Sequence, residues 1–353
     1  MAVIGGSVSN GHGMLDGRPY VYHAYPDTWH TFVSSWLNET YGPQAYINGA
    51  MAATQSSVFR FCWTERVALE EQAPDLVFIE LDVNDVLDDE SREASEALVR
   101  SIMHLPNKPA VLFVGSFALK PQNTKDGQLS GMDAHSPVAA YYDVPQISLR
   151  GAFTPALLQD RTLADPYFNG DARHIAPPLH KALGELIITY LEEQRCEVID
   201  PPEDPFVPSD IVPAPTFLGE VPKRLMQERW DTKSSHPHAP PTCRIAGSTL
   251  EPATPSPGWA SFSFMHAKYY LEAKQADQTV EFDVEIPEGG VGQIGVGYLR
   301  SPKYKLGRVI CHVGDQEKTL NGQWERSSSL TVCVSLFQLR HDLLVLTLNV
   351  VSY

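Results

Sequence analysis

The spacing of apolar residues changes along this chain, and that change constrains its fold more than any other feature. Over residues 1–197, short apolar runs alternate with amphipathic stretches, as in a parallel sheet covered by helices. Over residues 243–353, β-branched residues alternate with polar ones between Gly-containing turns, which is typical of antiparallel strands. Residues 198–242 between them are dense in proline. We therefore expect an α/β domain over 1–197, a linker over 198–242 and a β-sandwich of jelly-roll type over 243–353.

The first region contains signals of particular helices and strands. Helices are expected over Thr28–Asn38, Asp88–Met103 and Pro177–Glu193, where apolar residues recur at helical spacing. An acidic cluster begins the second helix and a proline begins the third, and both are typical helix starts. Strands are expected at the short apolar runs Ala2–Gly5, Gln44–Ile47, Leu76–Leu81, Ala110–Val114 and Gln146–Leu149.

Charge and hydropathy argue against two classes of partner. The chain has 43 acidic and 27 basic residues and a net charge of −16, which repels a phosphate backbone, so no nucleic acid is expected to bind. No stretch approaches the roughly 20 apolar residues that cross a bilayer, so a soluble chain is expected. Its start, MAVIGGS, lacks the layout of a signal peptide but already resembles a core strand. A secretory or extracellular location therefore stays open if an upstream segment is missing.

The sequence predicts neither a metal nor a cofactor. Its five cysteines lack the CxxC spacing of a zinc site. Two of them, Cys311 and Cys333, lie in expected strands, where they either pair as a disulfide or stay as buried thiols. The glycine-rich segment GGSVSNGHG has neither GxGxxG spacing nor a GK[ST] ending, which argues against a nucleotide site.

Ser7 is the first candidate for chemistry. It follows the first expected strand directly, in Gly5-Gly6-Ser7, and the glycines permit a sharp turn there. Such a turn would expose the Ser7 hydroxyl at the carboxyl edge of the sheet, where open α/β sheets bind their ligands. Taken alone, a Gly-Gly-Ser segment is more often only a tight turn.

A possible base for this serine lies near the end of the first region. Asp171 precedes His174 by three residues, on a loop just ahead of the helix expected at Pro177. A carboxylate can hold one imidazole nitrogen while the other nitrogen takes the serine proton. The alternative is a solvated loop in which Asp171 is only a turn residue.

Further polar groups follow other expected strands. Asn84 follows the strand at Leu76–Leu81, and Gly49 follows the strand at Gln44–Ile47. Parallel strands bring these ends to one rim, so the Asn84 amide and the N–H groups of Gly49 and Ser7 are expected to form an oxyanion hole. Taken alone, either asparagine, Asn84 or Asn48 just before Gly49, is more often a turn former.

Three histidines complete the set of candidates. His12 shares the loop of Ser7 and is a candidate for substrate contact. His135 is expected on a polar loop that could line a pocket. His180 lies in the helix that begins at Pro177 and is expected to pack or cap there rather than act as a base.

The order of these blocks resembles a known superfamily. GGS, NGA, a strand ending in VND, and DxxH look like the four blocks of the SGNH (GDSL-like) hydrolases, and the match covers the whole first region. The segments YPDTWHTFVSSWLNETY, SSVFRFCW and HSPVAAYYDVPQISLR are similar to a eukaryotic branch related to capsule-associated and other glycan-modifying esterases. The segment YLRSPKYKLGRVICHVGD, followed by LNGQWE, resembles the β-rich tail of that branch.

The resemblance implies a flavodoxin-like three-layer α/β/α domain with a parallel sheet and no metal. By block, Ser7 is the nucleophile, Asp171 and His174 complete the triad, and Ser7, Gly49 and Asn84 form the oxyanion hole. The sequence departs from the pattern in reading GGS where GDS is usual, and in having Ile175 where proline is usual. Neither departure removes a catalytic atom.

The expected function is ester hydrolysis through an acyl-Ser7 intermediate, on a small ester or an acylated glycan such as an O-acetylated carbohydrate. Two alternatives stay open. One is a glycan-binding or scaffold protein that keeps the fold without turnover, and the other is an O-acyltransferase with the same residues and a different acceptor.

Overall fold

The computed structural model describes residues 1–14, 26–67, 73–119, 129–168, 172–199, 221–226, 240–264, 268–286, 293–325, 329–338 and 343–352. Its contacts divide the chain into two compact units. The N-terminal unit is Met1–Ala52 with Arg66–Glu228, and the C-terminal unit is Ala53–Glu65 with Arg229–Tyr353. Most of the proline-rich stretch that we predicted as a linker lies outside the described residues.

A five-stranded parallel sheet is the framework of the N-terminal unit, in the strand order β2-β1-β3-β4-β5. The predicted α/β fold is therefore confirmed. The last strand ends one residue early because the Ser148 side chain accepts a hydrogen bond from the N–H of Arg150 and starts a helix there. The strands are β1 (Ala2–Gly5), β2 (Ile47–Asn48), β3 (Leu76–Glu80), β4 (Ala110–Gly115) and β5 (Gln146–Ser148).

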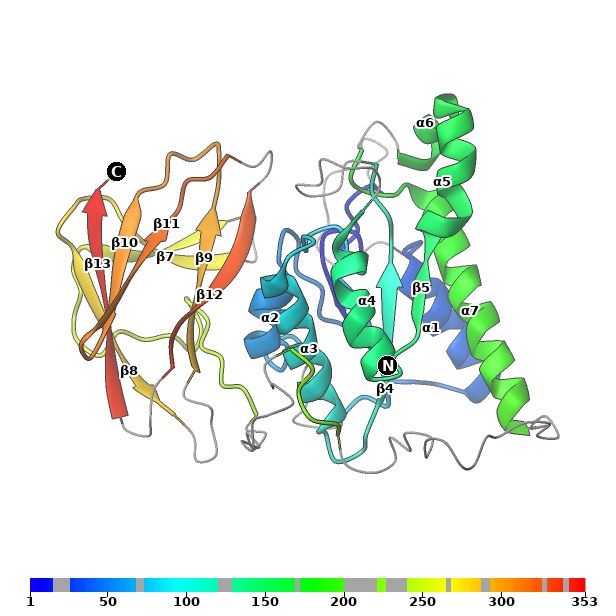
Figure 1. The fold of residues 1–353 in the computed structure, drawn as a ribbon, viewed down its shortest axis with the longest axis horizontal. Helices are drawn as coiled ribbons and strands as arrows, with labels where there is room; N and C mark the ends of the chain where they lie inside the picture. The colour runs from blue at the N-terminus through cyan, green and yellow to red at the C-terminus, as the bar shows by residue number, and fades with distance from the viewer. Residues whose placement is uncertain are drawn as a thin grey trace. The chain divides into compact units, whose positions relative to one another are not determined.

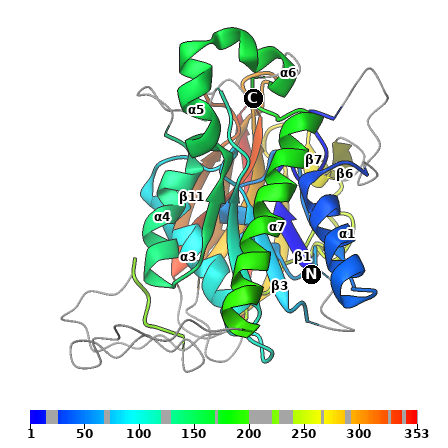
Figure 2. The same cartoon turned by 90° about the vertical axis from the view of Figure 1, so that its right-hand side faces the viewer.

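Helices cover both faces of this sheet (Figures 1 and 2). On one face α1 (Trp29–Tyr41) packs beside α7 (Pro177–Ile199), and on the other α3 (Asp89–Met103) packs beside α4 (Gly131–Tyr141). The predicted helices at α1, α3 and α7 are confirmed. Short helices that the sequence did not predict follow the fifth strand, namely α5 (Leu149–Gln159), η1 (Arg161–Leu163) and α6 (Ala164–Phe168).

One hydrophobic cluster of the N-terminal unit joins the sheet to the pair α1 and α7. Side chains from the strands, such as Val3 and Phe78, are fully buried with Trp29 of α1 and Leu179 and Leu183 of α7. Each fully buried side chain of this size contributes about 1.5–3 kcal/mol of hydrophobic stabilisation. The core therefore fixes the start of α7, and with it the loop that precedes this helix.

The C-terminal unit is built of antiparallel strands, as predicted. It has a four-stranded sheet in the order β11-β10-β13-β8 and two strand pairs, β12 with β9 and β6 with β7. Its core includes Val280, Phe282, Val313 and Leu346. The strands are β6 (Trp259–Phe264), β7 (Lys268–Ala273), β8 (Thr279–Glu285), β9 (Gln293–Arg300), β10 (Arg308–Val313), β11 (Gln316–Asn321), β12 (Leu330–Gln338) and β13 (Leu343–Ser352).

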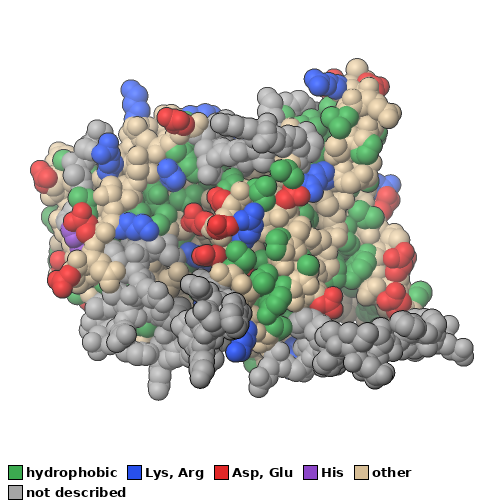
Figure 3. Space-filling model, viewed as in Figure 1, with side chains coloured by type: hydrophobic (Ala, Val, Ile, Leu, Met, Phe, Trp, Pro, Cys, Tyr) green, Lys and Arg blue, Asp and Glu red, His purple; other side chains and the backbone are tan. Residues whose placement is uncertain are grey.

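The surface and the helices give one further finding each. Charged side chains are interspersed with hydrophobic ones on the face shown in Figure 3. Within the described residues, every helix is too short or too polar to cross a membrane.

A short segment between β2 and β3 in the sequence belongs to the C-terminal unit. This segment, Ala53–Glu65, contains α2 (Ser56–Cys62) and is joined to residue 243 by a disulfide between Cys62 and Cys243. The N–H of Thr331 donates to the carbonyl oxygen of Ala53 at 2.8 Å. The ammonium group of Lys268 also donates to the hydroxyl of Thr54 at 3.2 Å. The segment is therefore held by both covalent and hydrogen bonds.

The cysteine pairing could not be read from the sequence, because neither member of the bonded pair stands in a recognisable motif. Of the two alternatives left open for Cys311 and Cys333, the structure has both as buried thiols outside any disulfide. Burial raises the pKa of the Cys311 thiol, so this thiol stays protonated and unreactive.

Opening the disulfide should destabilise the protein. It links residues 181 positions apart, and closing a loop of that size removes unfolded-state entropy worth up to about 5 kcal/mol. We expect Cys62→Ser to lower the thermal midpoint measured by differential scanning calorimetry. The matched control is Cys196→Ser, which alters an exposed thiol and should leave the midpoint unchanged. Equal midpoints for both variants would contradict the structural role of this bond.

Candidate active site

Ser7 lies in a tight turn directly after β1. The turn is closed by hydrogen bonds from the N–H of Asn10 to Gly6 O at 3.1 Å and from the N–H of His12 to Ser7 O at 2.9 Å. Ser7 is buried, with 6% of its surface exposed. Among the residues that the structure describes, its amide N–H has no hydrogen-bond acceptor. A buried donor without an acceptor is suited to receive a negatively charged oxygen.

His174 reaches this turn from the loop before α7. Its Nε2 lies 2.8 Å from the Ser7 hydroxyl oxygen, although the two residues are 167 positions apart. This is the distance of a hydrogen bond between a hydroxyl and an imidazole. The structure therefore brings together the two residues that the sequence proposed as nucleophile and base.

Gly13 lets the two loops approach so closely. Its φ is +92°, a conformation that side chains disfavour, and an added Cβ would lie 2.2 Å from Ile175 O and 3.0 Å from the Cβ of His174. Ile175, which stands where the superfamily usually has proline, is fully buried. The backbone of the Ser7 loop thus packs directly on the backbone that carries His174.

The predictions for Asp171, the third triad member, and for His12 and His180 can be compared with the structure in turn. Asp171 lies outside the described residues. The His12 ring lies beside the His174 ring, with centroids 5.3 Å apart. His180 is fully buried, and its Nδ1 accepts a hydrogen bond from the N–H of Trp29 at 3.2 Å. Burial lowers the pKa of His180 to about 3, so it stays neutral and packs in the core, as predicted.

Asn84 and Gly49, which were both expected to donate to the oxyanion, differ in what their N–H groups contact. An added Cβ on Gly6 would lie 2.3 Å from Nδ2 of Asn84, so this amide lies against the backbone next to Ser7. By contrast, the N–H of Gly49 donates to Val3 O at 2.9 Å and thus belongs to the pairing between β2 and β1. Of these two residues, only Asn84 therefore has a donor, its side-chain amide, placed near the serine.

Asn48 has a positioning role that the sequence analysis did not assign. Its Nδ2 donates to Ser9 O at 3.0 Å, and its Oδ1 accepts from the N–H of Ala50 at 3.0 Å. Asn48 therefore ties the end of β2 to the serine turn. Asn48 is the first residue of the NGA block, which was the available signal, but a turn former gives the same pattern.

Buried acidic groups lie at the end of β3. Glu80 is 1% exposed and accepts a hydrogen bond from the Ser9 hydroxyl at 2.8 Å. Asp85 contacts Nε2 of His135 at 2.7 Å, and both side chains are buried. The prediction that His135 lies on a polar loop is wrong, because it is inside α4. A glutamate ending the apolar run LVFIE was the signal that the sequence analysis missed.

The parallel sheet, with the contact between Ser7 and His174 at the end of its first strand, is an arrangement that can be compared with known structures. The chain shares its fold with a solved esterase. It is similar in structure to a two-domain esterase active on acetylated mannans, at 19% sequence identity and a TM-score of 0.66. A second structure of that two-domain esterase, co-crystallised with mannopentaose, gives 18% identity and a TM-score of 0.67. Each match covers 99% of this chain and 85% of the other. No family model and no curated protein matches the sequence.

Adding a side chain at Gly13 should separate Ser7 from His174. We expect Gly13→Ala to lower the rate at which a fluorophosphonate probe labels Ser7 at least about tenfold, because the new Cβ pushes His174 away from the hydroxyl. The matched control is Gly42→Ala, which has the same backbone strain at φ +82° but no atom within 4 Å of the added Cβ. Equal labelling of the two variants would show that the close approach at Gly13 is not needed.

Proposed function

We propose that this protein is a serine-dependent carboxylic ester hydrolase that acts through an acyl-Ser7 intermediate. The observation that carries the proposal is the 2.8 Å contact between His174 Nε2 and the Ser7 hydroxyl. A fold shared with a two-domain esterase is consistent with it.

The geometry suggests a role for each group. His174 Nε2 takes the Ser7 proton as the hydroxyl oxygen attacks the ester carbonyl, and then gives that proton to the departing alcohol. The acyl group is left on Ser7. A water molecule, deprotonated by His174, then attacks the acyl carbon and releases the carboxylic acid, which restores the serine. In this proposal Asp171 holds the other imidazole nitrogen.

We assign the oxyanion hole to two donors, the N–H of Ser7 and the side-chain amide of Asn84. Each such donor is worth about 3 kcal/mol of barrier in comparable sites. The Gly49 N–H, which the sequence suggested as a third donor, is committed to Val3. Gly49 instead permits close packing of the backbone, because an added Cβ would lie only 3.0 Å from Arg66 O.

The proposed substrate is an O-acetylated glycan. The two structures of a two-domain esterase active on acetylated mannans support this class, and one of them was crystallised with a mannan oligosaccharide. His12, beside His174, is the residue we assign to substrate contact. Transfer to a second alcohol would use the same residues and differ only in the acceptor that replaces water.

Removing the nucleophile is the direct test. We expect Ser7→Ala to lower kcat for p-nitrophenyl acetate and for acetylated mannan or xylan at least about 10³-fold, while the thermal midpoint stays nearly unchanged. The matched control is Ser95→Ala, because Ser95 is a buried serine on α3 whose hydroxyl donates to Arg92 O. Residual activity in Ser7→Ala equal to that of the control would rule out the proposed mechanism.

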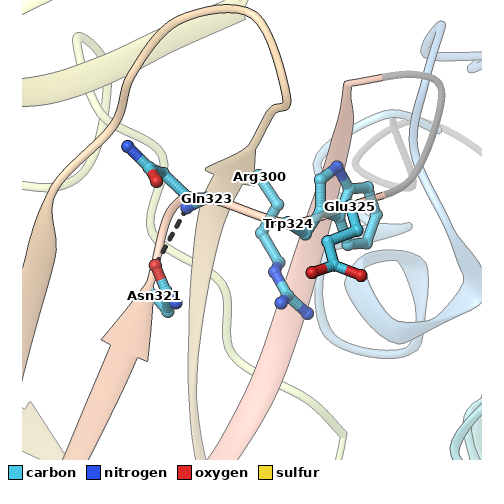
Figure 4. Close-up of a pocket in the computed structure, with 5 residues that line it drawn as sticks. All are labelled: Arg300, Asn321, Gln323, Trp324 and Glu325. Carbon is cyan, nitrogen blue, oxygen red and sulfur yellow. Dashed lines mark hydrogen bonds between the residues drawn. The ribbon is translucent and has the colours of Figure 1, made fainter.

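A second candidate function, glycan binding, is favoured by a hollow of about 550 Å³ in the C-terminal unit. The guanidinium carbon of Arg300 lies 4.6 Å from the centroid of the Trp324 ring. An aromatic ring among planar polar groups is a common lining of ligand sites, and the opposite charges of Arg300 and Glu325 suit a neutral sugar. Figure 4 shows the lining residues, which are Arg300, Asn321, Gln323, Trp324 and Glu325.

Binding can be separated from turnover. We expect Ser7→Ala protein to bind deacetylated mannan or xylan oligosaccharides in calorimetric titrations, and Gln323→Ala in that background to weaken the affinity about threefold or more, through loss of a hydrogen bond. The control is Gln316→Ala, an exposed glutamine at the other end of β11. Equal affinity of the two variants would exclude this hollow as the sugar site.

A further inference from the structure

The Glu80 carboxylate lies under the serine turn and joins two strand ends. Its Oε2 accepts hydrogen bonds from the N–H of Gly6 at 3.3 Å, the N–H of Ser9 at 3.1 Å and the hydroxyl of Ser9 at 2.8 Å. These donors lie on both sides of Ser7 in the sequence. Its Oε1 lies 3.0 Å from the hydroxyl of Ser116, which follows β4. One side chain thus holds the nucleophile turn to the neighbouring strand.

A second buried carboxylate shares the same hydroxyl. Oδ1 of Asp82 lies 3.2 Å from the Ser116 hydroxyl oxygen, and Asp82 also accepts from the N–H groups of Ser116 and Phe117, each at 3.2 Å. A hydroxyl has one hydrogen and can donate it to only one of the two carboxylates. The arrangement therefore has room for one additional proton, between Ser116 and one of the two carboxylates.

The electrostatics favour a proton on Glu80. Burial and the neighbouring Asp82 raise the pKa of Glu80 to about 8. Burial also raises the pKa of Asp82, but two backbone N–H groups stabilise its charged form. These causes favour the proton on Glu80 and the negative charge on Asp82.

Titratable groups on the surrounding helices interact with Asp82 or lie near the serine turn. His135 of α4 and Arg150 of α5 interact electrostatically with Asp82. His30 of α1 contacts Ser9 O at 2.8 Å, and His180 of α7 accepts from the backbone N–H of Trp29. These groups thus act on Asp82 and on the turn that the Glu80 carboxyl holds.

We propose that Glu80 is a positioning residue for Ser7 and that Glu80 works as a neutral acid. The Glu80 carboxyl donates a hydrogen bond to the Ser116 hydroxyl oxygen, and the Ser116 hydroxyl donates a hydrogen bond to Asp82. The other oxygen of Glu80 holds the N–H and the hydroxyl of Ser9, and it shares the N–H of Gly6 with the backbone oxygen of Glu80. Glu80 thereby sets where the Ser7 hydroxyl meets His174. Loss of the proton places two adjacent charges in this buried chain and loosens the turn. The inference rests on the proposed function only for its catalytic readout.

The test compares two substitutions of Glu80. Glu80→Gln replaces the O–H donor by an N–H donor and should retain kcat, whereas Glu80→Ala should lower kcat at least about tenfold with little change in KM. The wild-type rate should decline above about pH 8 as Glu80 ionises, and Glu80→Gln should lack this decline. The control is Glu96→Ala, which removes an equally buried carboxylate of α3 that accepts a hydrogen bond from Tyr142 at the end of α4 and should leave kcat unchanged.

A second measurement does not depend on activity. An acid whose pKa is raised by folding makes the folded state bind more protons, so stability falls as pH rises from the ordinary glutamate value of 4.5 to about 8. The thermal midpoint of Glu80→Gln should lack this part of the pH dependence, which that of Glu96→Ala should keep. If Glu80→Ala does not fold, Ser9→Ala takes its place and should lower the labelling rate of Ser7 relative to Ser95→Ala.

The outcomes separate the two proposals. Unchanged kcat in Glu80→Ala, or unchanged Ser7 labelling in Ser9→Ala, would overturn the positioning role. A pH profile of Glu80→Gln identical to that of the wild type would overturn the role of the proton. An active Ser7→Ala would instead overturn the proposed function and leave the stability measurement to decide the state of Glu80.

Discussion

The hydrogen bond between Ser7 and His174 is the interaction on which the rest of the site depends, and neither residue makes it unaided. Ser7 is fixed because β1 is an inner strand of the sheet, with β2 on one side and β3 on the other. His174 is fixed because the helix that follows it buries Leu179 and Leu183 in the core. The contact is thus a product of burial at two distant places in the chain. Because Gly13 has no side chain, the loop that carries Ser7 can lie directly against the loop that carries His174.

Next to that contact, the structure keeps two acidic side chains, Glu80 and Asp82, away from water. Burying a carboxylate is unfavourable unless it is hydrogen-bonded or neutralised, and Glu80 and Asp82 are both hydrogen-bonded through Ser116. A purely apolar cluster would fill the same space at lower cost. It would not, however, offer acceptors to the N–H groups of the serine turn. The stability given up here is consistent with a turn that has to keep one conformation.

Much of the fold was predictable from the sequence, and so were parts of the site. Apolar runs predicted β1, β3, β4 and β5 because a buried parallel strand needs little else, whereas the strand expected at Gln44–Ile47 overlaps β2 only at Ile47. Short motifs at strand ends predicted that Ser7 and His174 would meet. Hydrogen-bond direction was not predictable: an NGA block does not reveal that the Gly49 N–H turns toward Val3. The Cys62–Cys243 pair was also hidden, since it depends on tertiary contacts and not on spacing.

The course of the chain through the segment Ala53–Glu65 limits how the two units can be separated. The polypeptide leaves the N-terminal unit after Ala52, contributes α2 to the other unit and returns at Arg66. A truncation after the long helix α7 would therefore leave α2 without β12, which it contacts, and Cys62 without its partner. Neither half of the gene therefore encodes a complete unit. Recombination at one point cannot exchange either half for an unrelated module, so the two must be inherited, expressed and engineered together.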